Sequence, residues 1–339
     1  MRLDAIPVLR PQFEMVSISP DETLVRSGVW SGLSYVLRDE KEAGTLSAVL
    51  QRIDGSRSIE AIAAEVPAAG EQEIVNLVQQ LLEGGLIELN EPGSVPSSAL
   101  SPVAPLLLQT TQQPLGESLN KLTSGLVGIV GSGTVAEELR AILERSGVGR
   151  VVTVTGVTPA AAGGIDAERL SFLVCALDQP DPALLAAVNR WALEEHIPWL
   201  IAAVDGVCGL IGPTVVPFET ACYHCYETRL IANMTYPEPY LAARQAAAAG
   251  HPSIGARRTL PSLAAVVAGW ASFEVIWGLT TGYLLTAGKQ LRMNFQTGAI
   301  ESVDVLKLPR CPACGPFGRQ EPNAVVYKTF DTILKEMGI

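Results

Sequence analysis

Two Cys-x-x-Cys pairs constrain this chain more than any other feature of its sequence. They are Cys222/Cys225 and Cys311/Cys314, with 85 residues between the second and third cysteines. Two such pairs supply four thiolates, the ligand set of a tetrahedral structural zinc site. A shared metal requires a fold that returns the end of the chain to the segment around residue 222. The alternatives are ordinary buried cysteines, a redox-active pair, or His224 in place of one thiolate.

The remaining sequence features indicate the cellular compartment in which the cysteines occur. Cys175 and Cys208 lie in apolar, strand-like runs, which is typical of core residues. The N-terminal segment has no apolar stretch followed by a small-residue cleavage site, so no secretory signal is predicted. We therefore expect a cytoplasmic protein, in which thiols stay reduced and paired cysteines favour metal over disulfides.

One stretch, Leu260 to Leu285, is long and apolar enough to be compared with a transmembrane helix. Pro261 opens it and Glu274 lies near its centre. Because a carboxylate at the centre of a bilayer is costly, we expect a buried core helix and no membrane partner.

The charge balance argues against nucleic acid as a partner. The chain has 24 basic and 35 acidic residues, a formal net charge of −11. Its first 91 residues contain 7 Lys/Arg against 15 Asp/Glu. Phosphate backbones and anionic membranes attract basic surfaces, so neither is expected to bind here.

Residues 1–91 are predicted to form a winged-helix-like α+β domain. Alternating runs bounded by turn residues predict strands, and apolar residues at helical spacing predict three short helices. Ser58 is the predicted N-cap of the second helix. The predicted strands are 13–18, 23–26, 33–38 and 86–89, and the predicted helices are 42–53, 59–66 and 71–82.

Three further segments follow. Residues 92–115 are rich in Pro, Ser and Gln and are predicted to be a linker. Residues 116–319 alternate strands and helices, which predicts an α/β, Rossmann-type doubly wound domain. Residues 320–339 form a C-terminal tail. The predicted strands of the large domain are 126–130, 151–155, 170–176 and 199–204, with helices reaching to 146 and over 183–195.

A glycine turn, Gly131-x-Gly133-x-x-Ala136, follows the first of these strands and opens a helix. This context fits the dinucleotide-binding fingerprint, in which backbone amides approach a phosphate. A working site also carries an acidic residue at the end of the next strand, and Thr155-Gly156 stands there instead. The pattern therefore predicts the fold together with a degenerate nucleotide loop.

Taken together, these features resemble the ThiF-like, ubiquitin-activating-type fold. The resemblance rests on the 128–133 loop, Asp178 closing a strand, the 197–199 turn, and the cysteine motifs 221–226 and 310–315. Active members bind ATP with magnesium and adenylate a carboxyl terminus, using an Asp-x-Asp that is missing here. Adenylation of a peptide or carrier carboxyl terminus is therefore the alternative function.

The N-terminal domain is similar to PqqD-like peptide-recognition elements, through residues 8–11, 53–55 and 81–86. Such an element joined to a degenerate ThiF-like domain resembles the ocin-ThiF-like F proteins of azol(in)e-forming peptide pathways. The resemblance implies a non-catalytic protein that binds the leader of a ribosomal precursor peptide. It would deliver that peptide to a YcaO-type cyclodehydratase, which forms thiazoline and oxazoline rings. A structural zinc on the four cysteines and a homodimer are also implied.

The leader is expected to add as a strand to segment 33–38, in a groove shared with helix 71–82. Helix residues Ile74, Leu77 and Leu81 are expected to face the core. The predicted leader-binding residues are Leu33, Tyr35, Val36, Leu37, Arg38, Val75, Gln79 and Leu82.

Overall fold

The computed structural model divides the chain into two compact units. It describes residues 2–10, 12–30, 34–39, 44–67, 69–91, 101–104, 106–107, 115–156, 170–251 and 259–315. The first unit is Met1–Ser124 with the short pieces Arg145–Gly149 and Leu279–Thr281, and the second unit is the remainder. The predicted tail 320–339 and most of the predicted linker 92–115 lie outside the described residues, so the predicted domain boundaries stay predictions.

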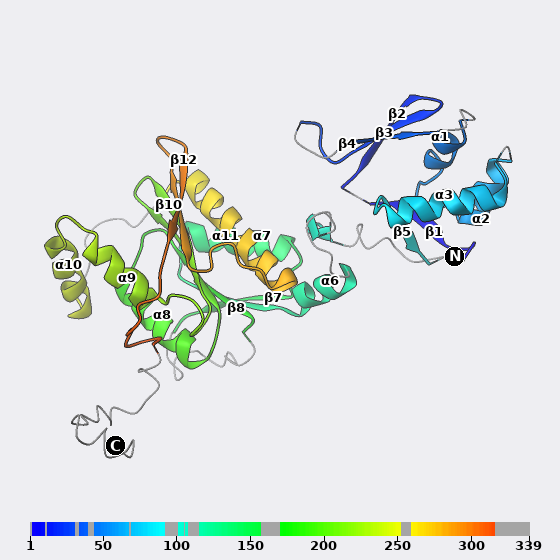
Figure 1. Cartoon of the computed structure of the whole chain (residues 1–339). Coiled ribbons are helices and arrows are strands. Elements are labelled where there is room, and N and C mark those ends of the chain that lie inside the picture. Colours follow the sequence, from blue (N-terminus) through cyan, green and yellow to red (C-terminus); the bar gives the residue numbers. More distant parts are fainter. Residues whose placement is uncertain are drawn as a thin grey trace, which may run out of the picture. The chain divides into compact units, whose positions relative to one another are not determined.

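Residues 2–91 of the first unit contain a three-stranded antiparallel sheet and three helices (Figure 1). The strand order is β2-β3-β4, so β4 is an edge strand. A separate strand pair, β1-β5, is also antiparallel. The strands are β1 (Ile6–Leu9), β2 (Glu14–Ser19), β3 (Glu22–Arg26), β4 (Ser34–Arg38) and β5 (Ile87–Asn90), and the helices are α1 (Thr45–Leu50), α2 (Ile59–Glu65) and α3 (Glu71–Glu83).

Most predicted elements of this unit are confirmed. The Ser58 side chain accepts a hydrogen bond from the backbone N–H of Ala61 at 3.2 Å, as expected of an N-cap. Helix α3 buries Ile74, Val78 and Leu81 in the core of the unit. The sequence analysis missed β1, because four residues that include Pro7 give no alternating pattern.

The second unit is built on a seven-stranded sheet with the order β12-β11-β10-β9-β8-β6-β7. Strands β7, β6, β8 and β9 are parallel, as predicted, and β10, β11 and β12 add antiparallel strands that were not predicted. The strands are β6 (Leu126–Val130), β7 (Arg150–Val154), β8 (Phe172–Leu177), β9 (Trp199–Asp205), β10 (Cys208–Val215), β11 (Lys289–Asn294) and β12 (Ala299–Asp304).

Helices cover both faces of this sheet. In Figure 1, α7 and α11 lie on one face, and α8 and α9 lie on the other. A large buried cluster forms between the sheet and α8, and it includes Trp191, Trp199 and the four paired cysteines. The helices are α6 (Leu115–Ser124, in the first unit), α7 (Thr134–Arg145), α8 (Pro182–Glu194), α9 (Tyr223–Ala232), α10 (Glu238–Ala248) and α11 (Pro261–Thr281).

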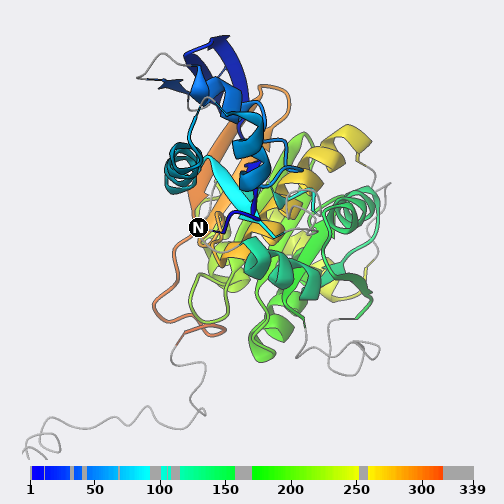
Figure 2. The ribbon, with the colours of Figure 1, turned by 90° about the vertical axis from the view of Figure 1, so that its right-hand side faces the viewer.

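Helix α11, yellow in Figure 2, is the one helix in the described part of the chain whose length and composition would allow it to cross a membrane. Its central Glu274 is 1% exposed. That carboxylate accepts hydrogen bonds from the hydroxyl of Thr214 (3.1 Å), from the backbone N–H of Leu285 (3.1 Å), and from the backbone N–H and hydroxyl of Thr286 (both 2.9 Å). A buried carboxylate needs such partners. Val266 and Trp270 of the same helix are exposed, so the expected core helix is only partly buried.

Candidate functional site

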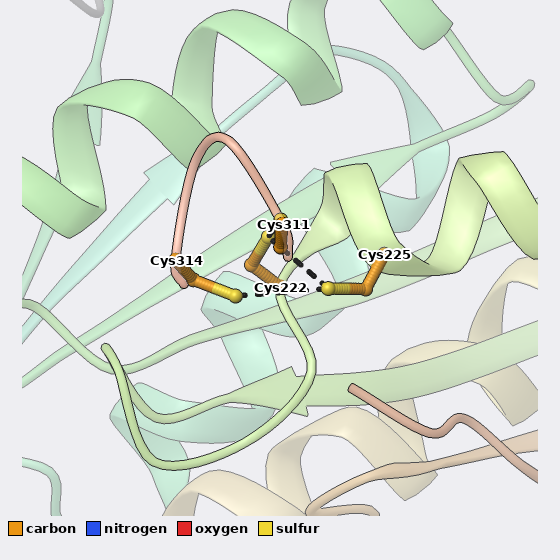
Figure 3. A group of neighbouring side chains, drawn as sticks. All are labelled: Cys222, Cys225, Cys311 and Cys314. Atoms are coloured by element: carbon orange, nitrogen blue, oxygen red, sulfur yellow. Dashed lines mark hydrogen bonds between the residues drawn. The ribbon is translucent and has the colours of Figure 1, made fainter. Parts of the chain in front are cut away.

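The four paired cysteines converge on one point from two distant segments (Figure 3). Cys222 is the N-cap residue of α9, Cys225 lies in its first turn, and Cys311 and Cys314 come from a tight loop. Their four sulfur atoms lie within 4.8 Å of one another, and all four residues are buried. Individual sulfur–sulfur distances are 3.9 Å (222–225), 3.7 Å (222–311) and 3.6 Å (225–314).

These distances fit a metal better than a disulfide. A disulfide requires about 2.05 Å between sulfurs, and the cysteines are free thiols. Zinc at about 2.3 Å from each of four tetrahedral sulfurs separates them by roughly 3.8 Å. The residues that would hold the ion are the four predicted ones, whereas His224 lines a neighbouring cavity. The arrangement is consistent with a closed structural zinc site.

The thiol chemistry supports the same conclusion. Because the Cys222 thiol donates to the sulfur of Cys225, the pKa of Cys225 is lowered to about 4 and the pKa of Cys222 is raised. Burial raises the pKa of Cys314 to about 11. The hydrogen bond and burial therefore oppose ionisation of Cys222, burial opposes that of Cys314, and a bound metal ion is what deprotonates such thiols.

Hydrogen bonds fix the segment that leads into the second cysteine pair. The backbone N–H of Leu308 donates to the Cys225 sulfur at 3.3 Å. Arg229 Nε donates to the carbonyl of Leu306 at 2.7 Å. Residues 306–308 are therefore attached to α9 by hydrogen bonds, in addition to the cysteine cluster that follows them.

The glycine turn of the nucleotide fingerprint is present, but a side chain of the protein fills it. Gly131 and Gly133 have φ values of 122° and 110°, and a Cβ atom on Gly133 would lie 2.6 Å from Asp178 Oδ2. The Asp178 carboxylate accepts from the backbone N–H groups of Thr134 (3.1 Å) and Val135 (2.9 Å) at the start of α7. Those amides are the donors that a phosphate would need.

The other residues at this turn and along β7 make packing and hydrogen-bond contacts within the unit. Ala136 is 8% exposed and packs inside the unit. At the end of β7, Arg140 donates to the Val151 carbonyl at 3.0 Å and to the Thr153 hydroxyl. No carboxylate occupies residues 150–156, where a ribose partner would stand.

The predicted leader-binding residues of β4 lie on an exposed edge strand. Tyr35 and Leu37 pair with Val25 and Thr23, which are buried, so these two share the core side of the sheet. Val36 and Arg38 point to the other side. Tyr35 is 45% exposed and Val36 is 54% exposed. Arg38 pairs with Glu22 at 2.7 Å, and Leu33 lies outside the described residues.

The predicted residues of α3 have different surroundings. Val75 packs against the core of the first unit. Gln79 and Leu82 line a cavity of about 450 Å³. Its other lining residues are Arg2, Asp4, Ala5, Glu83, Leu89, Asn90 and Glu91. A groove shared by β4 and α3 therefore stays a prediction.

Sequence reasoning missed a buried polar cluster beside the cysteine site. Glu227 in α9 is 2% exposed, accepts from the Tyr240 hydroxyl at 2.9 Å, and pairs with Arg244 at 3.1 Å. Burial raises the pKa of Tyr240 to about 12. No local motif predicts this contact, because Tyr240 and Arg244 belong to α10, a helix that the sequence analysis did not predict.

Comparisons with known proteins concern the fold. No family model matches the chain, and no curated protein does. The heterocyclase TruD superposes with a TM-score of 0.67 and 23% identity, over 92% of this chain and 43% of that chain. A heterocyclase in complex with substrate and cofactor has a TM-score of 0.66 and 21% identity, over 92% of this chain and 40% of that chain. E. coli MccB with ATP has a TM-score of 0.58 and 17% identity, over 91% of this chain and 99% of that chain.

The chain thus spans less than half the length of these heterocyclases and nearly all of MccB. At these identities the similarity establishes the fold alone. The predicted fold class is confirmed: a mixed α/β, ThiF-like sheet, preceded by a small N-terminal β-containing region and carrying a four-cysteine cluster suited to zinc.

Proposed function

We propose that this protein is a non-catalytic peptide-binding partner of a heterocycle-forming enzyme. It binds the leader of a ribosomal precursor peptide and delivers the peptide to a YcaO-type cyclodehydratase, which it also activates. Two solved structures of similar fold are heterocyclases, and MccB of the same fold has been crystallised with MccA.

The observation that carries the non-catalytic role is the contact between Asp178 and the start of α7. A nucleotide phosphate at this turn would compete with a carboxylate that already holds the N–H groups of Thr134 and Val135. The missing acidic residue after β7 removes the usual ribose partner.

The peptide-binding role is supported by β4. An edge strand offers unpaired backbone N–H and C=O groups, to which an extended peptide can add as a further strand. Tyr35 on one side and Val36 on the other supply half-exposed apolar contacts beside that edge. The excess of acidic residues in 1–91 favours a leader with basic side chains.

The partner enzyme is inferred from the similarity to the two heterocyclases, of which this chain spans 43% and 40%. In this proposal a YcaO-type cyclodehydratase performs the chemistry with its own ATP. The four-cysteine site would hold zinc with a structural role only, because all four ligand positions are protein thiolates and none is left open.

A matched pair of variants tests the peptide-binding site. Val36 on β4 and Ile18 on β2, the opposite edge, have similar exposures of 54% and 56%. In the full chain, Val36→Asp should weaken leader binding at least about tenfold in calorimetric titration, while Ile18→Asp leaves it unchanged. Equal losses in both variants would contradict binding at β4.

A second candidate is ATP-dependent adenylation of a carboxyl terminus. It is favoured by the similarity to MccB over 99% of that chain, in a structure that contains ATP. ATP–pyrophosphate exchange that depends on an added peptide acceptor would establish this activity and refute the non-catalytic proposal.

A further inference from the structure

A cavity of about 400 Å³ lies beside the four-cysteine cluster, and it includes neither the four cysteines, nor the glycine turn, nor β4. Helices α8, α9 and α10 form three of its walls, and Pro312 and Ala313, between the last two cysteines, form a fourth. This size is within the range of cavities that bind small molecules or single side chains. The residues that line it indicate what it binds.

Arg244 lies in one wall of the cavity, where an ion pair fixes its position. Its Nη2 pairs with Glu227 at 3.1 Å, and the Glu227 side chain is 3% exposed. Glu227 in turn accepts from the hydroxyls of Tyr240 (2.9 Å) and Tyr223 (3.5 Å). A guanidinium has five N–H donors, and the Arg244 side chain remains 38% exposed. The network thus fixes Arg244 and leaves donors for a ligand.

Arg190 of α8 supplies a second guanidinium to the same cavity. It is exposed, and no ion pair or hydrogen bond of its side chain occurs within the part of the chain that the structure describes. The chain has 35 acidic residues against 24 basic ones. The donors of Arg190 therefore remain available to an added anion.

The rest of the lining is largely apolar. Leu193, Phe218 and Ala313 contribute hydrocarbon surface. Phe218 has φ 64°, a conformation that is rare for a bulky side chain, and Lys307 Nζ donates to its carbonyl at 2.5 Å. Strained residues that the surroundings hold in place cluster at ligand sites.

We propose that this cavity binds an organic carboxylate that carries an apolar group. Arg190 and Arg244 bind the carboxylate, since guanidinium groups match its two oxygens, and Phe218 with Leu193 contacts the apolar part. A phosphate suits the site less well. The carboxylates of Glu194 and Glu227 also line the cavity and repel a dianion more than a monoanion, and a phosphate leaves the apolar wall without a partner.

Two kinds of ligand carry a carboxylate beside an apolar group: a free organic acid, and a peptide with an acidic side chain next to an apolar residue. N-acetylleucine represents the first, with N-acetylleucine amide as its uncharged control. The capped peptide acetyl-Leu-Glu-Leu-amide represents the second, with acetyl-Leu-Gln-Leu-amide as its control. Each probe, and inorganic phosphate, is titrated into the full-length, zinc-loaded protein by calorimetry or NMR.

We expect saturable binding of at least one carboxylate probe, with an affinity at least about tenfold higher than that of its amide control. Arg190→Ala removes an exposed residue and should abolish that preference without lowering the melting temperature. Arg244→Lys keeps the partner of Glu227 and should weaken binding through loss of the planar fork. The tighter carboxylate identifies the source.

Three results would overturn the proposal: equal affinity for acid and amide, tighter binding of phosphate than of either carboxylate, or undiminished binding in Arg190→Ala. Leader binding at β4 is measured separately on a different unit of the chain. Failure here therefore leaves the proposed function untouched, and the reverse also holds.

Discussion

Replacing Asp178 by alanine is the perturbation that most directly tests the filled nucleotide turn. The substitution removes the carboxylate that accepts from the backbone N–H groups of Thr134 and Val135. It leaves two donors at the start of α7 without their acceptor. It also removes a negative charge from the positive end of the helix dipole.

The expected cost follows from these contacts. Hydrogen bonds to charged groups contribute about 1.5–3 kcal/mol each when buried. Asp178 is only partly buried, and water can reach the freed amides, so the lower part of that range applies to the pair together. We expect a loss of roughly 2 kcal/mol for Asp178→Ala. For a unit of this size that lowers the melting temperature by about 4–8 °C.

The assay is thermal unfolding followed by circular dichroism, with Asp205→Ala as the matched control. Asp205 ends the neighbouring strand β9 at the same edge of the sheet and is exposed. Its replacement should change stability by no more than about 0.5 kcal/mol. If Asp178→Ala is no more destabilising than Asp205→Ala, the carboxylate does not stabilise the turn and the reasoning about an occupied site is wrong.

Three further predictions concern the metal, a half-buried carboxyl and a helix cap. Cys314→Ser should lower the bound zinc, measured by mass spectrometry, from about one equivalent, and should also lower the melting temperature. Cys208→Ser, outside the cluster, should retain the metal. Equal zinc in both variants would exclude the four-cysteine site. Burial raises the pKa of Glu88, so its ionised form opposes folding at pH values above that raised pKa. Glu88→Gln should therefore raise the melting temperature at pH 7, and the gain should shrink as the pH falls through that raised pKa. A gain that grows on acidification would contradict this reasoning. Ser58→Ala should cost about 1 kcal/mol in denaturant unfolding through loss of the bond to Ala61, and no loss would show that α2 does not depend on its cap.

The sequence predicted the parts of the fold whose pattern is local. Strand β6 is a continuous apolar run followed by a glycine turn, and α3 repeats apolar residues at helical spacing, so both were found. Strand β10 was missed because Gly209, Gly212 and Pro213 interrupt its apolar pattern. Strand β12 was missed because its residues are all exposed and carry no signal of burial.

The candidate site also combines features that a local sequence pattern predicts with features that depend on distant contacts. Cysteine spacing predicted which four residues come together, since two Cys-x-x-Cys pairs are the usual ligand set of a structural zinc. The filling of the nucleotide turn could not be predicted, because Asp178 comes 44 residues after Thr134 and only the parallel pairing of β6 with β8 brings them together. The arginine-lined cavity depends likewise on the packing of α10 against α8.

We propose that this chain binds a peptide and has no catalytic use for ATP. Calorimetric titration of the full-length protein, once with the leader peptide and once with ATP and magnesium, tests both parts of this proposal. We expect saturable binding of the leader and none of ATP. Saturable ATP binding without affinity for the leader would contradict it and would support the adenylating alternative.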